Sequence, residues 1–339
     1  MSQTSELGFL ERLDITPHTD DLRIISGSAN PALSAAIADE LGVPLTAIEL
    51  ARFADGETKV NILESVRGAD VFVIQPTSPP VNDHVMDLLI ILDTLKRASP
   101  RRVTAVIPYY GYSRQEKKIR PREPITARLV ADLLQAAGAQ RVLALDLHVQ
   151  SIQGFFNVPV DHLTAGPLLA DYLMNHGLGN AHSVVISPDV GAVGQALAFG
   201  ERLGSSLAIT VKRRPEPNRS EVFELIGDLE GKRAVIIDDI IDTGGTLISA
   251  AEVAIARGAT EVYACATHPL LSHDAVELLE RSPFKQVVVS DSIPLPEARR
   301  TPKFQVVSVA PLLAEAIKRV HADQSVSSLF HRYWFQDRH

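Results

Sequence analysis

Short apolar runs alternate with longer amphipathic runs along this chain, and that alternation narrows the possible folds more than any other feature. The apolar runs predict β-strands, and many stretches between them begin with Pro or Asn and stop at Gly, as helices do. Strands that alternate with helices form βαβ units with parallel neighbours. The sequence therefore predicts an α/β protein with largely parallel sheets. The predicted strands are 22–26, 70–75, 103–108, 142–147, 183–187, 234–238, 261–267, 286–290 and 305–309, and the predicted helices are 31–42, 82–99, 124–138, 191–204, 246–258 and 310–320.

Two segments of the chain resemble each other. Residues 134–148 and 254–268 align without gaps and share Ala, Gly, Ala, Val, Ala and His at the same offsets. Each reads as a helix end, a glycine stop, a strand and a histidine, although a generic αβ connection gives a similar pattern. We expect two similar α/β halves that meet around residues 159–166.

The stretch AVIIDDIIDTGGT, residues 234–246, is the most informative motif for function. Adjacent glycines let backbone N–H groups approach a phosphate, and the start of the following helix attracts its negative charge. The preceding carboxylates can accept hydrogen bonds from vicinal sugar hydroxyls. The plain alternative is an ordinary αβ turn, while the signatures of P-loops and dinucleotide-binding loops are missing. We interpret the motif as a ribose 5-phosphate cradle built by Asp238, Asp239, Asp242, Thr243, Gly244, Gly245 and Thr246.

Two other stretches have the chemistry of a nucleotide site. In RFADGE, residues 52–57, Phe53 can stack on a base and two acids can accept from an amine or from hydroxyls, although an Asp-Gly turn explains the pattern too. The run 109–122 is aromatic and then strongly basic, and it follows a predicted strand. Such a run can hold a polyphosphate, and the alternative is a solvated charge run.

Sparse carboxylates near strand ends favour magnesium over zinc. Asp146 and His148 end one predicted strand, and Asp189 ends the next. Mg²⁺ keeps several waters and takes few protein ligands, whereas no Cys/His spacing for zinc is present. A histidine at a strand end also has a purely structural interpretation.

A basic hairpin and the overall composition complete the picture. Lys212 to Pro215 lead a polar loop that can close on a polyphosphate, or is simply an exposed hairpin. The net charge of −8 argues against nucleic-acid binding. Cys265 is the single cysteine, so we expect no disulfide within the chain and a reducing cytoplasm. We expect no membrane span, no signal peptide and a polar extension at 1–19.

Taken in order, these stretches resemble the ribose-phosphate diphosphokinases, also called PRPP synthetases. The resemblance covers residues 20–330 and implies two tandem type I phosphoribosyltransferase-like domains. We expect an ATP-side domain over 20–163, completed by about 321–339, and a ribose 5-phosphate-side domain over 164–320. The motifs that carry the resemblance are RFADGE, VIQPTSPPVND, VIPYYGYSRQEKK, PITARLVADLL, DLHVQSIQGFF, SPDVG, KRRP, VIIDDIIDTGGT, ATHPLLS and SVSSLF.

The resemblance implies Mg²⁺-dependent transfer of the pyrophosphoryl group of ATP to the anomeric hydroxyl of ribose 5-phosphate, which gives PRPP and AMP for nucleotide biosynthesis. It assigns catalysis to Lys212 and Arg214, and the metal to His148 and Asp189. Arg214 would also contact ribose 5-phosphate, together with the cradle of residues 238–246. ATP would be held by Phe53, Asp55, Gly56, Glu57, Arg114 and Gln115.

The resemblance also implies regulation and assembly. It implies homo-hexamers built from dimers, with an anion site between subunits that takes phosphate and ADP. The residues of this chain that match that site are Ser65, Arg67, Ser325, Ser327 and Phe330.

The chain departs from the family pattern at a few positions. Ala192 and Gln195 replace Gly and Arg beside the metal site, Ile119 replaces an acid, and Glu116 replaces the usual Asp. The expected effect is on the start of the helix beside the metal and on the ATP-side loop.

Two rival functions share parts of this pattern. A phosphoribosyltransferase that consumes PRPP has a DDIIDTGGT-type loop but does not need RFADGE or YSRQEKK. A non-catalytic relative that regulates an active synthetase should have damaged catalytic loops, whereas KRRP, DLH and DDIIDTGGT are intact here.

Overall fold

Five parallel strands form the first sheet, in the order β1–β4–β5–β6–β7. The computed structural model describes residues 21–213, 222–327 and 329. The central strands of this sheet are buried on both faces, which explains their continuous apolar sequences. The elements of this part are β1 (Leu22–Ser26), α1 (Pro31–Leu41), β2 (Ile48–Arg52), β3 (Thr58–Ile62), β4 (Asp70–Ile74), α2 (Val81–Ala98), β5 (Arg102–Ile107), α3 (Thr126–Ala137), β6 (Arg141–Leu145), η2 (Gln150–Phe155) and β7 (Val160–Leu163).

A second sheet has the order β10–β9–β8–β11–β12–β13–β14. All its neighbours are parallel except the β9–β10 hairpin, which extends one edge. Its elements are α4 (Gly166–Asn175), β8 (Ser183–Ser187), α5 (Val193–Leu203), β9 (Ser206–Arg213), β10 (Val222–Ile226), β11 (Arg233–Ile241), α6 (Gly245–Ala256), β12 (Glu261–Pro269), α7 (Ala275–Arg281), β13 (Phe284–Ser290), η3 (Glu297–Arg299), β14 (Phe304–Val307) and α8 (Ala310–His321).

The two halves repeat one order of elements, so the prediction of two similar α/β units with largely parallel sheets is confirmed. Each runs strand, helix, hairpin, strand, helix, strand, helix, strand, 3₁₀ turn and strand. The alignment that suggested the repeat is wrong by one strand, because it pairs β6 with β12. In the observed order β12 corresponds to β5, and β13 corresponds to β6. The helix–glycine–strand signature recurs at several connections. An ungapped alignment could therefore match β12 to β6, one strand away from its true counterpart β5.

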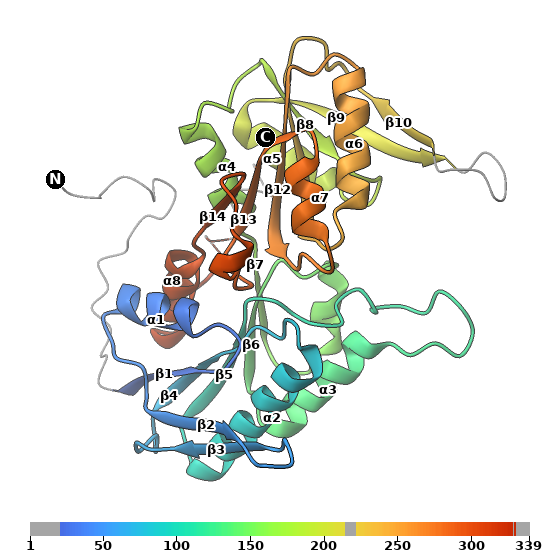
Figure 1. The fold of residues 1–339 in the computed structure, drawn as a ribbon. Helices are drawn as coiled ribbons and strands as arrows, with labels where there is room; N and C mark the ends of the chain where they lie inside the picture. Colours follow the sequence, from blue (N-terminus) through green and yellow to red (C-terminus); the bar gives the residue numbers. More distant parts are fainter. Residues whose placement is uncertain (1–20, 214–221, 328, 330–339) are drawn as a thin grey trace.

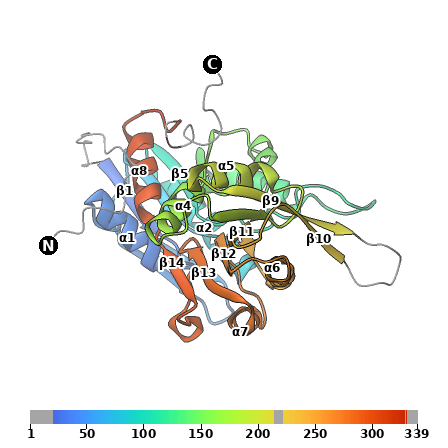
Figure 2. The same ribbon diagram turned by 90° about the horizontal axis from the view of Figure 1, so that it is seen from above.

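Helices cover both faces of each sheet (Figures 1 and 2). In the first half, α2 and α3 pack on one face, and α1 and α8 pack on the other. In the second half, α6 and α7 cover one face, and α4 and α5 cover the other. Side chains from α1, α4, α5 and α8 and from both sheets belong to one continuous apolar cluster, which also contains the thiol of Cys265. A single packed layer therefore joins the two halves.

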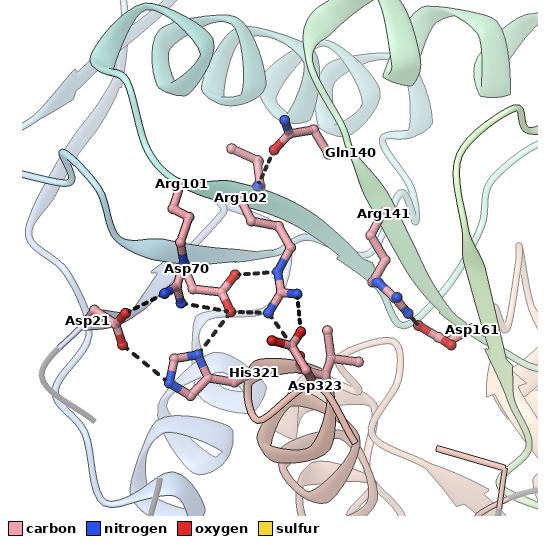
Figure 3. Close-up of polar contacts among 11 residues, drawn as sticks. Asp21, Asp70, Arg101, Arg102, Gln140, Arg141, Asp161, His321 and Asp323 are labelled. Atoms are coloured by element: carbon pink, nitrogen blue, oxygen red, sulfur yellow. Dashed lines mark hydrogen bonds and ion pairs between the residues drawn. The ribbon is translucent and has the colours of Figure 1, made fainter. Parts of the chain in front are cut away.

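The end of α8 is attached to the first sheet by ion pairs (Figure 3). Arg102 contacts the buried carboxylate of Asp70 through Nε at 2.9 Å and also contacts Asp323 at 2.8 Å. Nδ1 of His321 lies 2.9 Å from Oδ2 of Asp70, and its Nε2 lies 3.4 Å from Asp21. The C-terminal helix thus returns to the beginning of β4 and β5. The predicted domain limits at 19/20, 163/164 and 320/321 stay predictions.

Most predicted elements are observed within two or three residues of their expected ends. The β2–β3 hairpin, β7, α4 and α7 were not predicted, and β11 runs on through Asp238 and Asp239 to Ile241. Among the described residues, no helix has both the length and the apolar character that crossing a bilayer requires.

Candidate functional site

The carboxyl ends of the two sheets face each other, and polar contacts join them, two of which involve predicted site residues on both sides. Nη1 of Arg114, in the loop after β5, lies 2.6 Å from Oδ2 of Asp242, which follows β11. Nδ1 of His148, just after β6, lies 2.8 Å from Oδ2 of Asp239 on β11. Strand ends of parallel sheets are where α/β proteins bind ligands. The structure therefore brings the predicted polyphosphate loop, metal region and sugar-phosphate loop to one place.

The loop between β11 and α6 has the geometry of an anion cradle. Gly244 has φ 78° and is the N-cap of α6, and no side chain caps that helix. The first N–H groups of a helix have no partners within the helix, and helix N-termini commonly bind anions. Backbone hydrogen bonds from Leu271 to Ile241 and from Ser272 to Asp242 fix the loop on the neighbouring β12 side. The predicted cradle residues 242–246 are thus held together on a rigid support.

The acidic pair on β11 carries excess negative charge. Burial, helped by the charges of Asp239 and Asp189, raises the pKa of Asp238 to about 8. Burial alone would raise the pKa of Asp239 as well, but hydrogen bonds with His148 and Asp238 outweigh it and hold that pKa below its usual value. The hydrogen bond with Asp239 raises the pKa of His148 despite its partial burial. The pair therefore shares one proton near neutral pH, and a cation beside it would relieve the repulsion.

A cavity of about 1000 Å³ lies between the strand ends. His148, Asp189, Asp238 and Asp239 all line it, so the predicted metal pair shares one space with the acidic pair. Within the described part of the chain, no three His, Cys, Asp or Glu side chains converge closely enough to enclose a metal ion. That donor set fits Mg²⁺ held by a few protein oxygens and several waters, and it does not fit a closed zinc site.

Asp189 has a second role in the loop after β8. Its Oδ1 accepts a hydrogen bond from the N–H of Ala192 at 2.9 Å, immediately before α5 begins at Val193. Ala192 and Gln195, two of the departures from the family pattern, line the cavity. The departures therefore affect the wall of the site itself.

Neighbouring side chains of the loop after β5 contact different halves of the molecule. Arg114 faces Asp242, whereas the side chain of Gln115 accepts a hydrogen bond from Thr126 at 2.6 Å at the start of α3. Glu116 and the residue after it line the cavity, and Ile119 is 80% exposed. In both ribbon views this loop projects from the same side of the molecule as the β9–β10 hairpin (Figures 1 and 2).

The predicted RFADGE residues lie at the tip of the β2–β3 hairpin and do not line the cavity. The backbone of Phe53 and Glu57 closes the turn, Gly56 has φ 94°, and Asp55 accepts from the N–H of Glu57 at 3.1 Å. Phe53 is 51% exposed. The structure thus exposes these side chains without bringing them to the other site residues.

The hairpin arm has a support that the sequence did not reveal. Asp87 of α2 is buried, and it contacts Nη1 of Arg52 at 2.7 Å and Oγ1 of Thr58 at 2.7 Å. These contacts hold the base of the hairpin on α2. The only signal of this role in the sequence was an acid with apolar neighbours, Met86 and Leu88, on both sides.

The remaining predicted residues are only partly described. The backbone of Lys212 lies on β9 opposite Phe223, but its side chain is outside the described part, as are Arg214 and Phe330. Oγ of Ser325 lies 2.6 Å from Oγ of Ser327. Ser65 and Arg67 occupy the loop before β4, and within the described residues no hydrogen bond or ion pair joins them to that serine pair.

Comparisons with known proteins agree with this arrangement. The family model for the N-terminal domain of ribose phosphate pyrophosphokinase matches residues 22–138, and the phosphoribosyl synthetase-associated domain matches residues 208–331. A ribose-phosphate pyrophosphokinase of Caldanaerobacter subterraneus subsp. tengcongensis is 55% identical over 92% of this chain and 99% of its own length. One from Bacillus subtilis is 53% identical over 91% of this chain and 97% of its own length.

A solved structure is similar over nearly the whole chain. The phosphoribosylpyrophosphate synthetase from Mycobacterium smegmatis matches with a TM-score of 0.85 and 43% identity, covering 89% of this chain and 99% of that one. Near-complete coverage at such identity leaves no large domain of those relatives unmatched. The chain therefore belongs to the ribose-phosphate pyrophosphokinase family of enzymes.

Proposed function

We propose that the protein is a ribose-phosphate diphosphokinase that makes PRPP for nucleotide biosynthesis. The anomeric oxygen of ribose 5-phosphate bonds to the β-phosphorus of ATP, the bond from that phosphorus to the α–β bridging oxygen breaks, and AMP leaves with that oxygen. The hydroxyl proton is released. The observation that carries the proposal is the contact between Arg114 and Asp242, which joins a polyphosphate loop to a pentose-phosphate loop beside one cavity.

Ribose 5-phosphate binds the loop between β11 and α6 in this proposal. Its phosphate accepts hydrogen bonds from backbone N–H groups at the start of α6, as anions do at helix N-termini. Asp242 and the acidic pair on β11 hold the ring hydroxyls. The full set of residues is Asp238, Asp239, Asp242, Thr243, Gly244, Gly245 and Thr246, with Arg214 from the hairpin.

His148 and Asp189 hold Mg²⁺ together with water, next to the excess charge of the acidic pair. When bound, Mg²⁺ neutralises charge on the phosphates of ATP. Asp239 orients His148 through the 2.8 Å contact, and Asp189 keeps its place through the N–H of Ala192. The protein's part is therefore to present two ligands in a fixed direction.

Arg114 and Gln115 hold ATP near the cavity in this proposal, and the set is completed by Phe53, Asp55, Gly56 and Glu57, which lie away from that cavity within one chain. Lys212 and Arg214 are the catalytic cations, since transfer of this kind depends on positioning and charge neutralisation more than on covalent chemistry. The supporting observation is that the β9–β10 hairpin and the loop after β5 project from one side (Figure 2).

The decisive experiment incubates the protein with ATP, Mg²⁺ and ribose 5-phosphate and measures nucleotides and PRPP together. We expect AMP to appear in step with PRPP. ADP in place of AMP would identify an ordinary kinase, and consumption of added PRPP with a free base would identify a phosphoribosyltransferase. No product in either assay would favour the non-catalytic relative.

We also infer a cytoplasmic homo-hexamer that phosphate activates and ADP inhibits. Ser65, Arg67, Ser325, Ser327 and Phe330 form the anion site in this proposal, and because the two described parts of that set do not contact each other within one chain, a neighbouring subunit would complete it. Light scattering reports the assembly, and activity at constant Mg²⁺ and ionic strength reports the effect of phosphate. A monomer that is indifferent to phosphate would contradict the inference.

A further inference from the structure

One peptide bond beside the cavity is held at both of its polar atoms by histidines. The carbonyl oxygen of Asp146 lies 3.0 Å from Nε2 of His268, on β12 of the second sheet. The N–H of Leu147, on the other side of the same peptide bond, donates to Nε2 of His162 on β7 at 2.8 Å. One residue further along the chain is His148.

The side chain of Asp146 is held as tightly as its backbone. Its Oδ2 accepts hydrogen bonds from Oγ1 of Thr267 at 2.5 Å and from the N–H of Ala165 at 2.9 Å. Asp146 has φ 37°, in the left-handed region that non-glycine residues rarely occupy. Surrounding contacts must supply the energy that keeps such a residue there. Two of these contacts, from Thr267 and His268, come from the opposite sheet.

The two imidazoles need their protons on opposite nitrogens. A carbonyl oxygen only accepts, so Nε2 of His268 carries a proton, whereas Nε2 of His162 accepts and must be bare. Burial lowers the pKa of both rings, which favours the neutral forms. Neutral His268 then leaves Nδ1 to accept from Oγ of Ser292 at 2.9 Å. The Ser292 hydroxyl also lies 3.0 Å from the carbonyl oxygen of Thr267, but Ser290 already donates to that oxygen at 2.6 Å, so the Ser292 proton can turn to Nδ1 of His268 instead.

We propose that His162 and His268 are positioning residues that clamp the Asp146–Leu147 peptide and thereby aim His148 at Asp239 and the cavity. The direction of His148 depends on the plane of the peptide bond that precedes Leu147, and the clamp fixes that plane from both sides. The link to catalysis rests on the proposed function of His148.

The clamp also ties His148 to the sheet that carries its partner. His268 belongs to β12, the neighbour of β11, and β11 carries Asp239. The ring of His268 further contacts Tyr109 edge-on, with centroids 5.1 Å apart, at the end of β5. A shift of one sheet relative to the other would therefore displace the groups that hold this peptide bond.

The test compares substitutions that keep or remove each hydrogen bond. In His268→Gln the side-chain amide can still donate to Asp146, whereas His268→Phe keeps a ring against Tyr109 without a donor. We expect His268→Phe to lower kcat by about 10- to 100-fold, because small misplacements of reacting groups have effects of that size, with KM for both substrates changed less than about twofold. His268→Gln should recover kcat to within about threefold of wild type.

His162 supplies an independent arm if His268→Phe does not fold. His162→Gln keeps an acceptor for the N–H of Leu147, and His162→Leu removes it. Residues that act as one unit are not additive. We therefore expect the double variant His162→Leu/His268→Phe to lose no more kcat than the worse single variant. A loss equal to the product of the two single-variant losses would contradict the proposed clamp.

A matched control uses a histidine outside the cavity. His176 stacks on Tyr172 with centroids 4.1 Å apart and is exposed, so His176→Phe should leave kcat and KM unchanged. Wild-type kcat in folded His268→Phe and His162→Leu would overturn the inference. An inactive wild type would instead overturn the proposed function, so the two failures are distinguishable.

Discussion

At the scale of single residues, adjacent glycines in the proposed ribose 5-phosphate loop have different physical requirements. Gly244 has φ 78°, and a Cβ there would meet Leu279 at 3.4 Å. Gly245 has an ordinary backbone, and a Cβ there would meet nothing within 4 Å. The first glycine is therefore required by the backbone, whereas the second leaves open space where the proposed phosphate binds.

This difference predicts opposite effects of two alanine substitutions. Gly244→Ala should lower the free energy of unfolding by about 1–2 kcal/mol, the cost of a left-handed conformation for a residue with a Cβ. Gly245→Ala should leave stability unchanged or slightly raised, because alanine favours helices, but should raise KM for ribose 5-phosphate. Urea unfolding without ligand and steady-state kinetics check both. Equal loss of stability in the two variants would contradict the geometry.

The sequence predicted residues of the site when their chemistry is local, and it missed those whose role depends on distant partners. Asp242 and Gly244 belong to one short motif whose residues by themselves predict a sugar-phosphate ligand. His268 contacts a carbonyl 122 residues away, so a strand-end histidine was all that the sequence offered. The aligned His148 and His268 in fact occupy non-equivalent places, because His148 follows β6, whereas His268 lies on β12, which corresponds to β5.

At the scale of elements, the helices and central strands were predictable because their burial appears directly in the sequence. Half-buried helices give amphipathic runs, and strands buried on both faces give continuous apolar runs. The β2–β3 hairpin was missed because its strands are half-exposed and carry Glu, Lys and Arg among the apolar residues. β7 is a short edge strand with only Leu163 fully buried, so its pattern is weak. β11 runs past Asp238 because pairing with β12 satisfies its backbone beyond the apolar run.

The attachment of α8 to the first sheet depends on a buried carboxylate. Burial alone would raise the pKa of Asp70, but hydrogen bonds from His321 and Arg102 outweigh it and hold the pKa below its usual value. The ionised form therefore stabilises the fold at neutral pH. That contribution is fully present above about pH 4, the usual pKa of an aspartate in the unfolded chain. It is lost as pH falls from there through the lowered pKa of Asp70 in the folded state.

Asp70→Asn should consequently lower the free energy of unfolding by about 3 kcal/mol at pH 7, since it leaves the Arg102 charge without its buried partner. The difference from wild type should shrink as pH falls from about 4, where the unfolded chain takes up the proton, through the lowered pKa of Asp70 in the folded state. Asp93→Asn is the matched control, because Asp93 pairs with Arg97 at 2.8 Å on an exposed helix face. Urea unfolding at several pH values measures both. A deficit that stayed constant into acid would argue against this role.

At the scale of the whole molecule, the shared apolar layer makes the two halves one cooperative unit. Leu33 of α1, Leu173 of α4, Phe199 of α5 and Leu313 of α8 belong to the same buried cluster. The thiol of Cys265 lies within that cluster and is 1% exposed, and burial raises its pKa, so the reactive thiolate is strongly disfavoured in the folded state. Loss of either half should expose the layer and the thiol together.

We therefore predict that Cys265 reacts with a thiol reagent only when the whole protein unfolds. The urea midpoint for labelling should coincide with that for the far-ultraviolet circular dichroism signal, in a single step. Ligands that bind only the folded protein should shift both midpoints upward together. Two separate steps in the circular dichroism, or rapid labelling without urea, would contradict a shared core.

A common layer of packed helices also sets how far apart the opposing strand ends stand. Closely packed interiors resist small displacements, so the distance between the carboxyl ends of the two sheets behaves as a fixed length. If ATP binds between the halves as proposed, a nucleotide analogue one bond longer between its phosphates cannot be accommodated by moving the halves apart. Only the projecting loops could then change shape to fit such an analogue. Helix packing far from the reacting atoms would therefore make the site selective for the length of the phosphate chain.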